Sequence, residues 1–306
     1  LINSGEDVTA CTPWKETALM LIIKSKNKHT VEVIHLLIKA GVNFDARDKN
    51  GRTALMFAAE NDDKNFEEII YVLISAGANV NIEDSNGWTA LTFATQHEGK
   101  NFEAKVHALS GVDINARSVD GDTALIIAGM RGDEDTCVII RTLLSAGADV
   151  NIQNDNGKTA LMTITECSCE YAEENINTLI SAGAEVNLQA NYGETALMLA
   201  TQDWGKYAEG MMRALIAAGA NIEAQDTDRR TALMYVTYLD CEQAKANMLV
   251  LLQNGADVNV QNKEGCTVLM YAILYAPPAM IQTLLSAGAD VNIQNDNGKT
   301  ALMVLA

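Results

Sequence analysis

Several features that mark common protein classes are scarce in this sequence. Aromatic residues make up 5% of the 306 residues and there are only 3 prolines, which is unusual for β-sandwiches and favours helices rich in small residues. Lys and Arg total 22 against 40 Asp and Glu, a net charge of −18, so the chain lacks the basic surface that binds nucleic acid. No apolar run is long enough to span a membrane and no signal segment opens the chain. We expect a helix-dominated protein that neither binds nucleic acid nor inserts into a membrane.

Residues that commonly carry catalysis or bind metals are few and scattered. The 6 cysteines are irregularly spaced, which argues against a disulfide framework and favours a reducing, cytoplasmic compartment. Cys167 and Cys169 are the one close pair, and no second Cys or His pair lies nearby to complete a zinc site. Gly157–Thr159 resembles the end of a phosphate-binding loop, but Ile152 stands where that loop needs glycine. We therefore expect no enzymatic activity, no metal and no cofactor.

An internal repeat dominates the sequence. Thr-Ala-Leu-Met, or a close variant, begins at residues 17, 53, 89, 123, 159, 195, 231, 267 and 300. A second marker, Ala-Gly-Ala-Asp-Val-Asn or a relative, keeps the same register, with glycines at 41, 77, 111, 147, 183, 219, 255 and 288. Most steps are 36 residues, and Thr142–Met162 recurs unchanged as Thr283–Met303. A fixed period of this length predicts a solenoid of stacked units.

Each unit is predicted to form a helix, a loop, a second helix and a hairpin. The threonine hydroxyl can cap the first helix, as at Thr53 before an apolar run. A second apolar segment follows and ends at a glycine such as Gly77, which adopts the left-handed conformation readily. Turn residues such as Asp84–Gly87 lead to the next threonine. One such pair cannot bury its own apolar face, so neighbouring units must supply the core.

These residues resemble the ankyrin repeat, whose Thr-Pro-Leu-His opening corresponds to Thr-Ala-Leu-Met here. The segment Ala-Gly-Ala-Asp-Val-Asn followed by a hairpin glycine matches almost literally at 146–157 and 287–298. The resemblance covers essentially the whole chain and implies an all-α ankyrin-repeat solenoid, with stacked helix pairs joined by β-hairpin-like loops. The family's histidine is usually methionine here, which predicts apolar filling between repeats. Most units are also three residues longer than usual, and the extra residues fall between the two helices.

We expect one solenoid over residues 1–306, with partial repeats at 1–16 and 300–306. The whole repeats are predicted at 17–52, 53–88, 89–122, 123–158, 159–194, 195–230, 231–266 and 267–299. The unit at 89–122 is the shortest but one, and its second helix lacks the usual aliphatic pair, so we expect local opening to begin there. The partial repeats suggest a piece of a longer array, which leaves secretion or export open.

The resemblance implies a non-catalytic scaffold that binds a protein or peptide on its concave face. Residues there that differ between units form the candidate site: Trp14, Arg52, Trp88, Gln96, His97, Arg131, Tyr192, Gln202, Asp203, Trp204 and Tyr238. The three tryptophans fall outside the positions predicted to be core, as expected either for binding hot spots or for contacts with a neighbouring hairpin.

The acidic inter-helix loops predict either a solvated edge or a surface that attracts a basic partner. We expect the chain to be monomeric. Two alternatives remain: a targeting or regulatory arm of a larger enzyme or secreted effector whose catalytic domain lies outside this chain, and a structural array that associates with itself.

Overall fold

The computed structural model describes residues 10–61, 65–97, 101–202, 205–237 and 242–305. All regular structure in these ranges is helical, apart from one isolated bridge between Cys11 and Thr17. The chain divides into two compact units: residues 1–131 with 135–149, and residues 132–134 with 150–306. The all-α prediction is confirmed.

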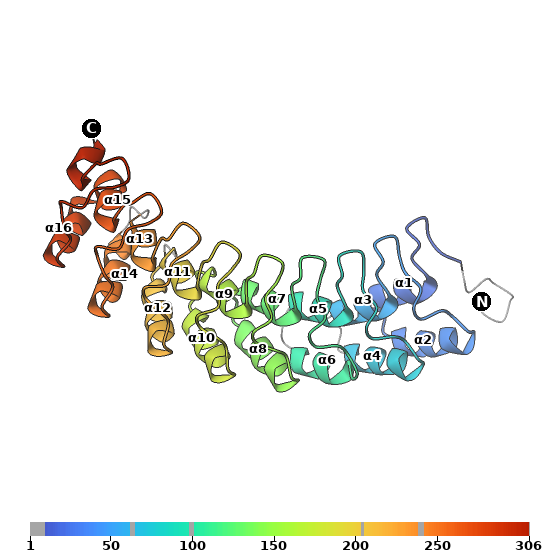
Figure 1. Ribbon diagram of the computed structural model, residues 1–306. Helices are drawn as coiled ribbons and strands as arrows, with labels where there is room; N and C mark the ends of the chain where they lie inside the picture. The colour runs from blue at the N-terminus through green and yellow to red at the C-terminus, as the bar shows by residue number, and fades with distance from the viewer. Residues whose placement is uncertain (1–9, 62–64, 98–100, 203–204, 238–241, 306) are drawn as a thin grey trace. The chain divides into compact units, whose positions relative to one another are not determined.

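The first unit consists of four helix pairs in two layers (Figure 1). The first helices of the pairs are α1 (Ala18–Lys24), α3 (Ala54–Glu60), α5 (Ala90–Gln96) and α7 (Ala124–Arg131). The second helices are α2 (Thr30–Lys39), α4 (Phe66–Ser75), α6 (Phe102–Ala108) and α8 (Thr136–Ser145). Within each layer, successive helices contact one another. Helix α6 is shorter than its equivalents, and its buried Lys105 stands where α4 and α8 carry Ile69 and Ile139.

The second unit repeats this arrangement. Its first helices are α9 (Ala160–Thr165), α11 (Ala196–Thr201), α13 (Ala232–Val236) and α15 (Val268–Tyr275), followed by the 3₁₀ helix η3 (Ala301–Leu305). Its second helices are α10 (Ala172–Ser181), α12 (Ala208–Ala217), α14 (Glu242–Gln253) and α16 (Pro278–Ser286). Only Ala276 and Pro277 separate α15 from α16, whereas six residues separate α9 from α10.

Local chemistry explains where the first helices begin. The hydroxyl of Thr53 accepts a hydrogen bond from the amide of Met56 at 3.4 Å, and Thr159 and Thr195 make the equivalent bonds. These bonds satisfy amides that have no partner within the helix. The predicted methionine stripe is confirmed as core, because its internal members are almost fully buried: Met20, Met56, Met162, Met198, Met234 and Met270.

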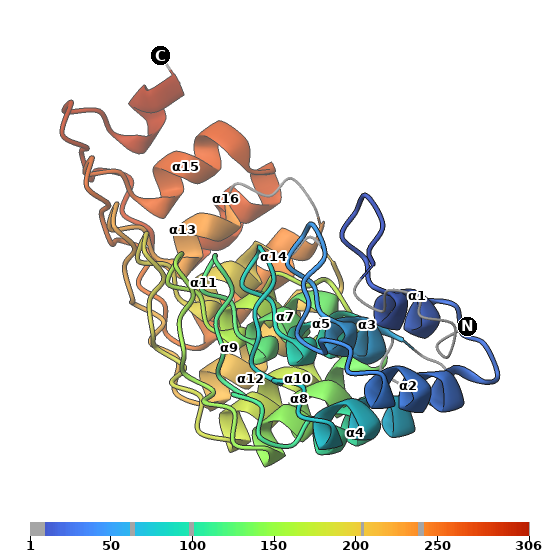
Figure 2. The same ribbon diagram turned by 90° about the vertical axis from the view of Figure 1, so that its right-hand side faces the viewer.

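Five-residue hairpin loops precede the first helices and lie side by side within each unit (Figure 2). In the loop at 84–88, the amide of Asp84 bonds the carbonyl of Trp88 at 2.9 Å, and the Asp84 carboxylate accepts from the amides of Asn86 and Trp88. Backbone bonds also join successive loops: the amide of Ser85 donates to the carbonyl of Asn50 at 2.9 Å. Each hairpin loop is therefore held by its own turn and by its neighbour.

Side-chain amides add a second connection between repeats. Asn151 donates to the carbonyl of Gly183 at 3.2 Å and accepts from the amide of Glu185 at 2.8 Å. Asn81 and Asn259 make the same pair of bonds with the repeats that follow them. Gln153 spans the carbonyls of Gly157 and Gln189. We call these contacts the amide clamps, and all of their partners on the next repeat are backbone groups.

Candidate functional site

At several hairpin loops, two positions of the repeat contact each other where the loop joins the first helix; we call this junction the hairpin foot. One is the residue just before the capping threonine, and the other lies one turn into the first helix. They bring together Arg52 and Phe57 at one repeat boundary, and Trp88 and Phe93 at the next. Side chains that cap the hairpin therefore pack against side chains of the first helix.

Arg52 is the centre of the larger group in the first unit. Its guanidinium carbon lies 4.1 Å from the ring centroid of Phe57 and 4.4 Å from that of Phe93. The ring of Trp88 meets Phe93 edge to face, with centroids 5.3 Å apart. Cations over aromatic faces and edge-to-face rings are both favourable arrangements. Side chains from two successive repeat boundaries thus form one packed group.

Glu60, at the end of α3, completes this group. It accepts a hydrogen bond from the Arg52 guanidinium and lies 3.2 Å from Nε2 of His97. Nδ1 of His97 is 3.0 Å from the carbonyl oxygen of Phe93. We refer to Arg52, Phe57, Glu60, Trp88, Phe93 and His97 as the Arg52 cluster. Arg131 joins its edge, because its guanidinium donates to the carbonyl of His97 at 3.3 Å.

Burial sets the electrostatics of the Arg52 cluster. It lowers the pKa of Arg52, while the nearby carboxylates of Asp48 and Asp84 act in the opposite direction. The Nε–H group of Arg52 is buried without a hydrogen-bond partner. A charged side chain held this way is fixed by its aromatic neighbours and by Glu60. The cluster therefore offers a preformed surface.

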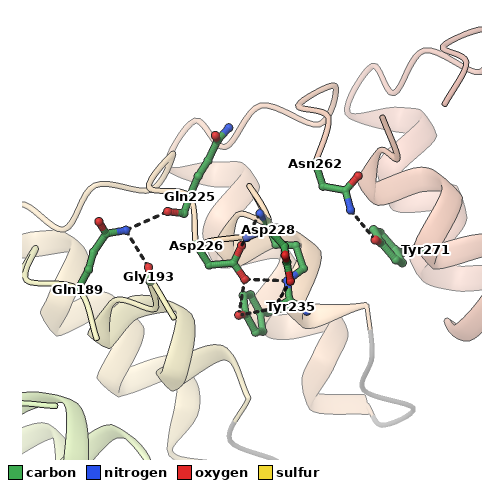
Figure 3. A network of polar contacts seen from close by, with 9 residues as sticks. Gln189, Gly193, Gln225, Asp226, Asp228, Tyr235, Asn262 and Tyr271 are labelled. Atoms are coloured by element: carbon green, nitrogen blue, oxygen red, sulfur yellow. Dashed lines mark hydrogen bonds and ion pairs between the residues drawn. The ribbon is translucent and has the colours of Figure 1, made fainter. Parts of the chain in front are cut away.

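A related arrangement in the second unit surrounds Tyr235 (Figure 3). The hydroxyl of Tyr235 donates to Oδ2 of Asp226 at 2.7 Å, and Nε of Arg230 donates to the same oxygen at 2.7 Å. The Arg230 guanidinium carbon lies 5.0 Å from the Tyr235 ring centroid. Oδ1 of Asp226 accepts from the amides of Asp228 and Arg230, which closes the hairpin loop. We call Asp226, Arg230 and Tyr235 the Tyr235 cluster.

The hydrogen bonds shift two pKa values in the Tyr235 cluster. Burial of Asp226 acts to raise its pKa, but the bonds from the Arg230 backbone, Tyr235 and the Arg230 side chain outweigh it, so the pKa is lowered. Burial and the bond to Asp226 raise the pKa of Tyr235. The ionised carboxylate and the neutral phenol are therefore the forms that this arrangement stabilises.

The dependence of the free energy of unfolding on pH, between neutral and acid conditions, tests this arrangement. Since the pKa of Asp226 is lower in the folded chain than in the unfolded chain, its contribution is present above the unfolded value, near pH 4. It is lost as the pH falls through the folded value. Asp226→Asn should cost about 1.5 kcal/mol at pH 7, the size of one hydrogen bond to a charged group. Its deficit relative to the parent should shrink on acidification.

Urea unfolding of both proteins at several pH values between 7 and 3 measures this difference. Asparagine is a suitable replacement because Asn154 and Asn262 already close their own hairpin loops with the same two bonds. Two stability curves that stay parallel down to pH 3 would show that the carboxylate contributes nothing beyond the loop.

The remaining predicted site residues fall in different surroundings. Trp14 is 56% exposed, and Nζ of Lys49 lies 3.5 Å from its ring centroid. Gln96 and Gln202 are exposed at the ends of α5 and α11, and Tyr192 is 72% exposed on a hairpin loop. The predicted residues Asp203, Trp204 and Tyr238 lie outside the described part of the chain. The structure thus brings Arg52, Trp88, His97 and Arg131 together in the first unit, whereas Tyr192 and Gln202 belong to the second unit.

Phe57, Phe93, Asp226 and Tyr235 were missed by sequence reasoning. A signal for three of them is present, because Phe57, Phe93 and Tyr235 each stand four residues after a capping threonine. That position is buried in most repeats, and in these repeats it also contacts the residue before the threonine. An aromatic residue at this position therefore marks a hairpin foot with a partner for the preceding side chain.

Within the described ranges, no helix has the length and apolar character needed to cross a membrane. The same ranges contain no group of three His, Cys, Asp or Glu side chains arranged as they would be around a metal ion.

Comparison with known proteins places these features in a family. The family description "Ankyrin repeats (3 copies)" matches residues 1–84, 21–109, 63–148 and 98–190. "Ankyrin repeat" matches 192–227, and "Ankyrin repeats (many copies)" matches 251–304. No curated protein sequence matches the chain significantly.

Among solved structures, the ankyrin repeat domain of Bcl-3, described as a unique member of the IkappaB protein family, is similar with a TM-score of 0.61. The two sequences are 23% identical, and the match covers 77% of this chain and 98% of that chain. The similarity therefore concerns the fold alone. Since the family matches extend through both units, the chain belongs to the ankyrin-repeat family.

Proposed function

We propose that the chain is a protein-interaction scaffold that binds a protein or peptide segment along the hairpin feet of its first helices. Ankyrin-repeat arrays serve protein–protein interaction in general, and the Arg52 cluster is the observation that supports this particular face. It combines half-buried Arg52, Trp88 and His97 with the buried rings of Phe57 and Phe93. Preformed aromatic and arginine groups of this kind are enriched at binding hot spots.

The charge distribution favours a basic partner with an apolar anchor. Several cations near the first helices are paired with carboxylates: Lys24 with Glu16 at 2.5 Å, Arg52 with Glu60, and Lys158 with Glu166 at 2.5 Å. Since each such pair is neutral, the net charge of −18 resides on the other carboxylates, which can attract positive residues. We infer that the apolar anchor of the partner contacts Trp88, while its basic residues face the surrounding carboxylates. The chain acts as a monomer in this proposal.

Replacing Trp88 with alanine tests the proposed face. Peptides selected from a displayed random library on the parent protein should bind Trp88→Ala at least about tenfold more weakly, because a hot-spot aromatic is lost. Fluorescence anisotropy with one labelled peptide measures the affinity. Trp88→Ala should stay within about 1 kcal/mol of the parent in stability, which thermal unfolding checks.

Tyr71→Ala is the matched control, since Tyr71 is a 69% exposed aromatic on α4, a second helix. We expect Tyr71→Ala to bind the selected peptides as the parent does. Peptides that lose affinity only for Tyr71→Ala would place the binding surface on the second helices instead. Affinity that rises with salt would contradict the basic character of the partner, because screening weakens attraction between opposite charges.

A further inference from the structure

Two cysteines lie close together in the loop between α9 and α10. The amide of Cys169 donates to the carbonyl of Cys167 at 2.7 Å, and a hydrogen bond between residues i and i+2 defines a γ-turn. The amide of Cys167 is bonded to the carbonyl of Ile164, and the carbonyl of Cys169 to the amide of Ala172. The turn is therefore fixed at both ends and folds its first and third residues toward each other.

Both sulphur atoms lie close to the position that a Cβ atom of Gly132 would occupy. A Cβ atom placed on Gly132 would lie 1.8 Å from Sγ of Cys167 and 3.4 Å from Sγ of Cys169. The sulphur atoms can thus be no further apart than the sum of these two distances. Gly132 has a φ of +70° and no side chain, and the Cys167 sulphur occupies the space that a side chain would take. The backbone turn and the position of Gly132 independently bring the thiols together.

The same pair is accessible to small molecules. Cys167 and Cys169 are both reduced and half-buried, whereas Cys137 is buried. Disulfide formation requires the two Cα atoms to lie within roughly 7 Å and the sulphur atoms to approach to about 2 Å. Side-chain rotation about Cα–Cβ bonds moves a sulphur atom without disturbing the backbone. Closure of this pair therefore requires no rearrangement of the helices.

We propose that Cys167 and Cys169 form a redox-active dithiol that closes reversibly to a disulfide by exchange with a small-molecule disulfide such as oxidised glutathione. One cysteine, as its thiolate, attacks a sulphur of the oxidant, which forms a mixed disulfide and expels one thiolate. The second cysteine attacks the protein sulphur of that mixed disulfide and expels the other thiolate. The protein loses two electrons and two protons, and the oxidant leaves as two thiols.

The sequence allows the redox state of this cysteine pair to be measured separately from the other cysteines. Lys158 and Lys206 flank a stretch without Lys or Arg, so trypsin releases residues 159–206 as one peptide whose only cysteines are 167 and 169. The full chain is incubated with oxidised glutathione, quenched with an alkylating reagent, digested without reduction and analysed by mass spectrometry. The expected product is a 159–206 peptide lighter than the reduced peptide by two hydrogens, without alkyl or glutathione groups. Dithiothreitol added before quenching should restore two alkylated cysteines.

Cys169→Ser is the matched variant, because it keeps the loop polar and removes the second nucleophile. It should stop at the mixed disulfide, seen as a peptide heavier by one glutathione moiety. Two results would overturn the proposal: a parent peptide that accumulates the same glutathione adduct, or a parent peptide that stays fully alkylatable. A circular dichroism spectrum equal to that of the parent confirms that the variant is folded.

Discussion

Gly157→Ala should destabilise the protein by about 3 kcal/mol. Gly157 has a φ of +75°, and a left-handed conformation costs a residue with a side chain roughly 1–2 kcal/mol. A Cβ atom there would also lie 2.7 Å from the amide nitrogen of Asn191 and 3.0 Å from the carbonyl carbon of Ala190. Both atoms belong to the backbone of the next hairpin loop, so the loops must separate, and overpacking of this kind costs about 1–3 kcal/mol.

Gly183→Ala separates these two contributions. Gly183 has a φ of +94°, but a Cβ atom added there would meet no other part of the chain within 4 Å. We expect this variant to lose only the conformational part, about 1–2 kcal/mol. Urea unfolding followed by circular dichroism measures both variants. Equal losses would mean that the hairpin loops move apart at no cost and that the bond from the Asn191 amide to the Asn156 carbonyl contributes little to stability.

Asn175→Leu should stabilise the protein by about 1–3 kcal/mol. Asn175 is fully buried in α10, and neither its amide nitrogen nor its oxygen has a hydrogen-bond partner. An unsatisfied buried polar group carries a desolvation cost of this size. Leucine has a similar branched shape, and the equivalent positions of α8 and α12 carry Ile139 and Met211, both fully buried. The substitution should thus remove the cost without creating a cavity.

The midpoint of urea unfolding should rise for Asn175→Leu while the slope stays unchanged. Asn177→Leu, at an exposed position of the same helix, controls for the higher helix propensity of leucine. A stability gain no larger than that of the control would contradict the assignment. It would indicate that a buried water molecule satisfies the amide of Asn175.

The helix pairs could be predicted from sequence because each repeat supplies the same local environment. A threonine hydroxyl caps the amide three residues later without help from other repeats. The methionine three residues after it is buried in each whole repeat that carries one. The period alone therefore identified the helix starts and most of the core.

The environment of residues that depart from the repeat pattern could not be predicted, because it depends on the neighbouring repeats. Lys105 and Asn175 stand at a position where α4 and α8 carry isoleucine, and all of them are buried. Arg229 occupies a hairpin position that is glycine in most repeats and still adopts a φ of +60°. The Arg52 cluster likewise depends on Phe93, which lies two predicted repeats after Arg52. A pattern averaged over repeats contains no information about such single substitutions.

The amide clamps have a consequence for how genes of this kind change. Asn151 and Gln153 bind the carbonyls of Gly183 and Gln189, and Asn151 also accepts from the amide of Glu185, so the neighbour contributes only backbone atoms to these bonds. Any repeat with the same loop geometry can take that place, whatever its side chains. Recombination that inserts or deletes a whole repeat therefore preserves these bonds to the neighbouring backbone at the new junction.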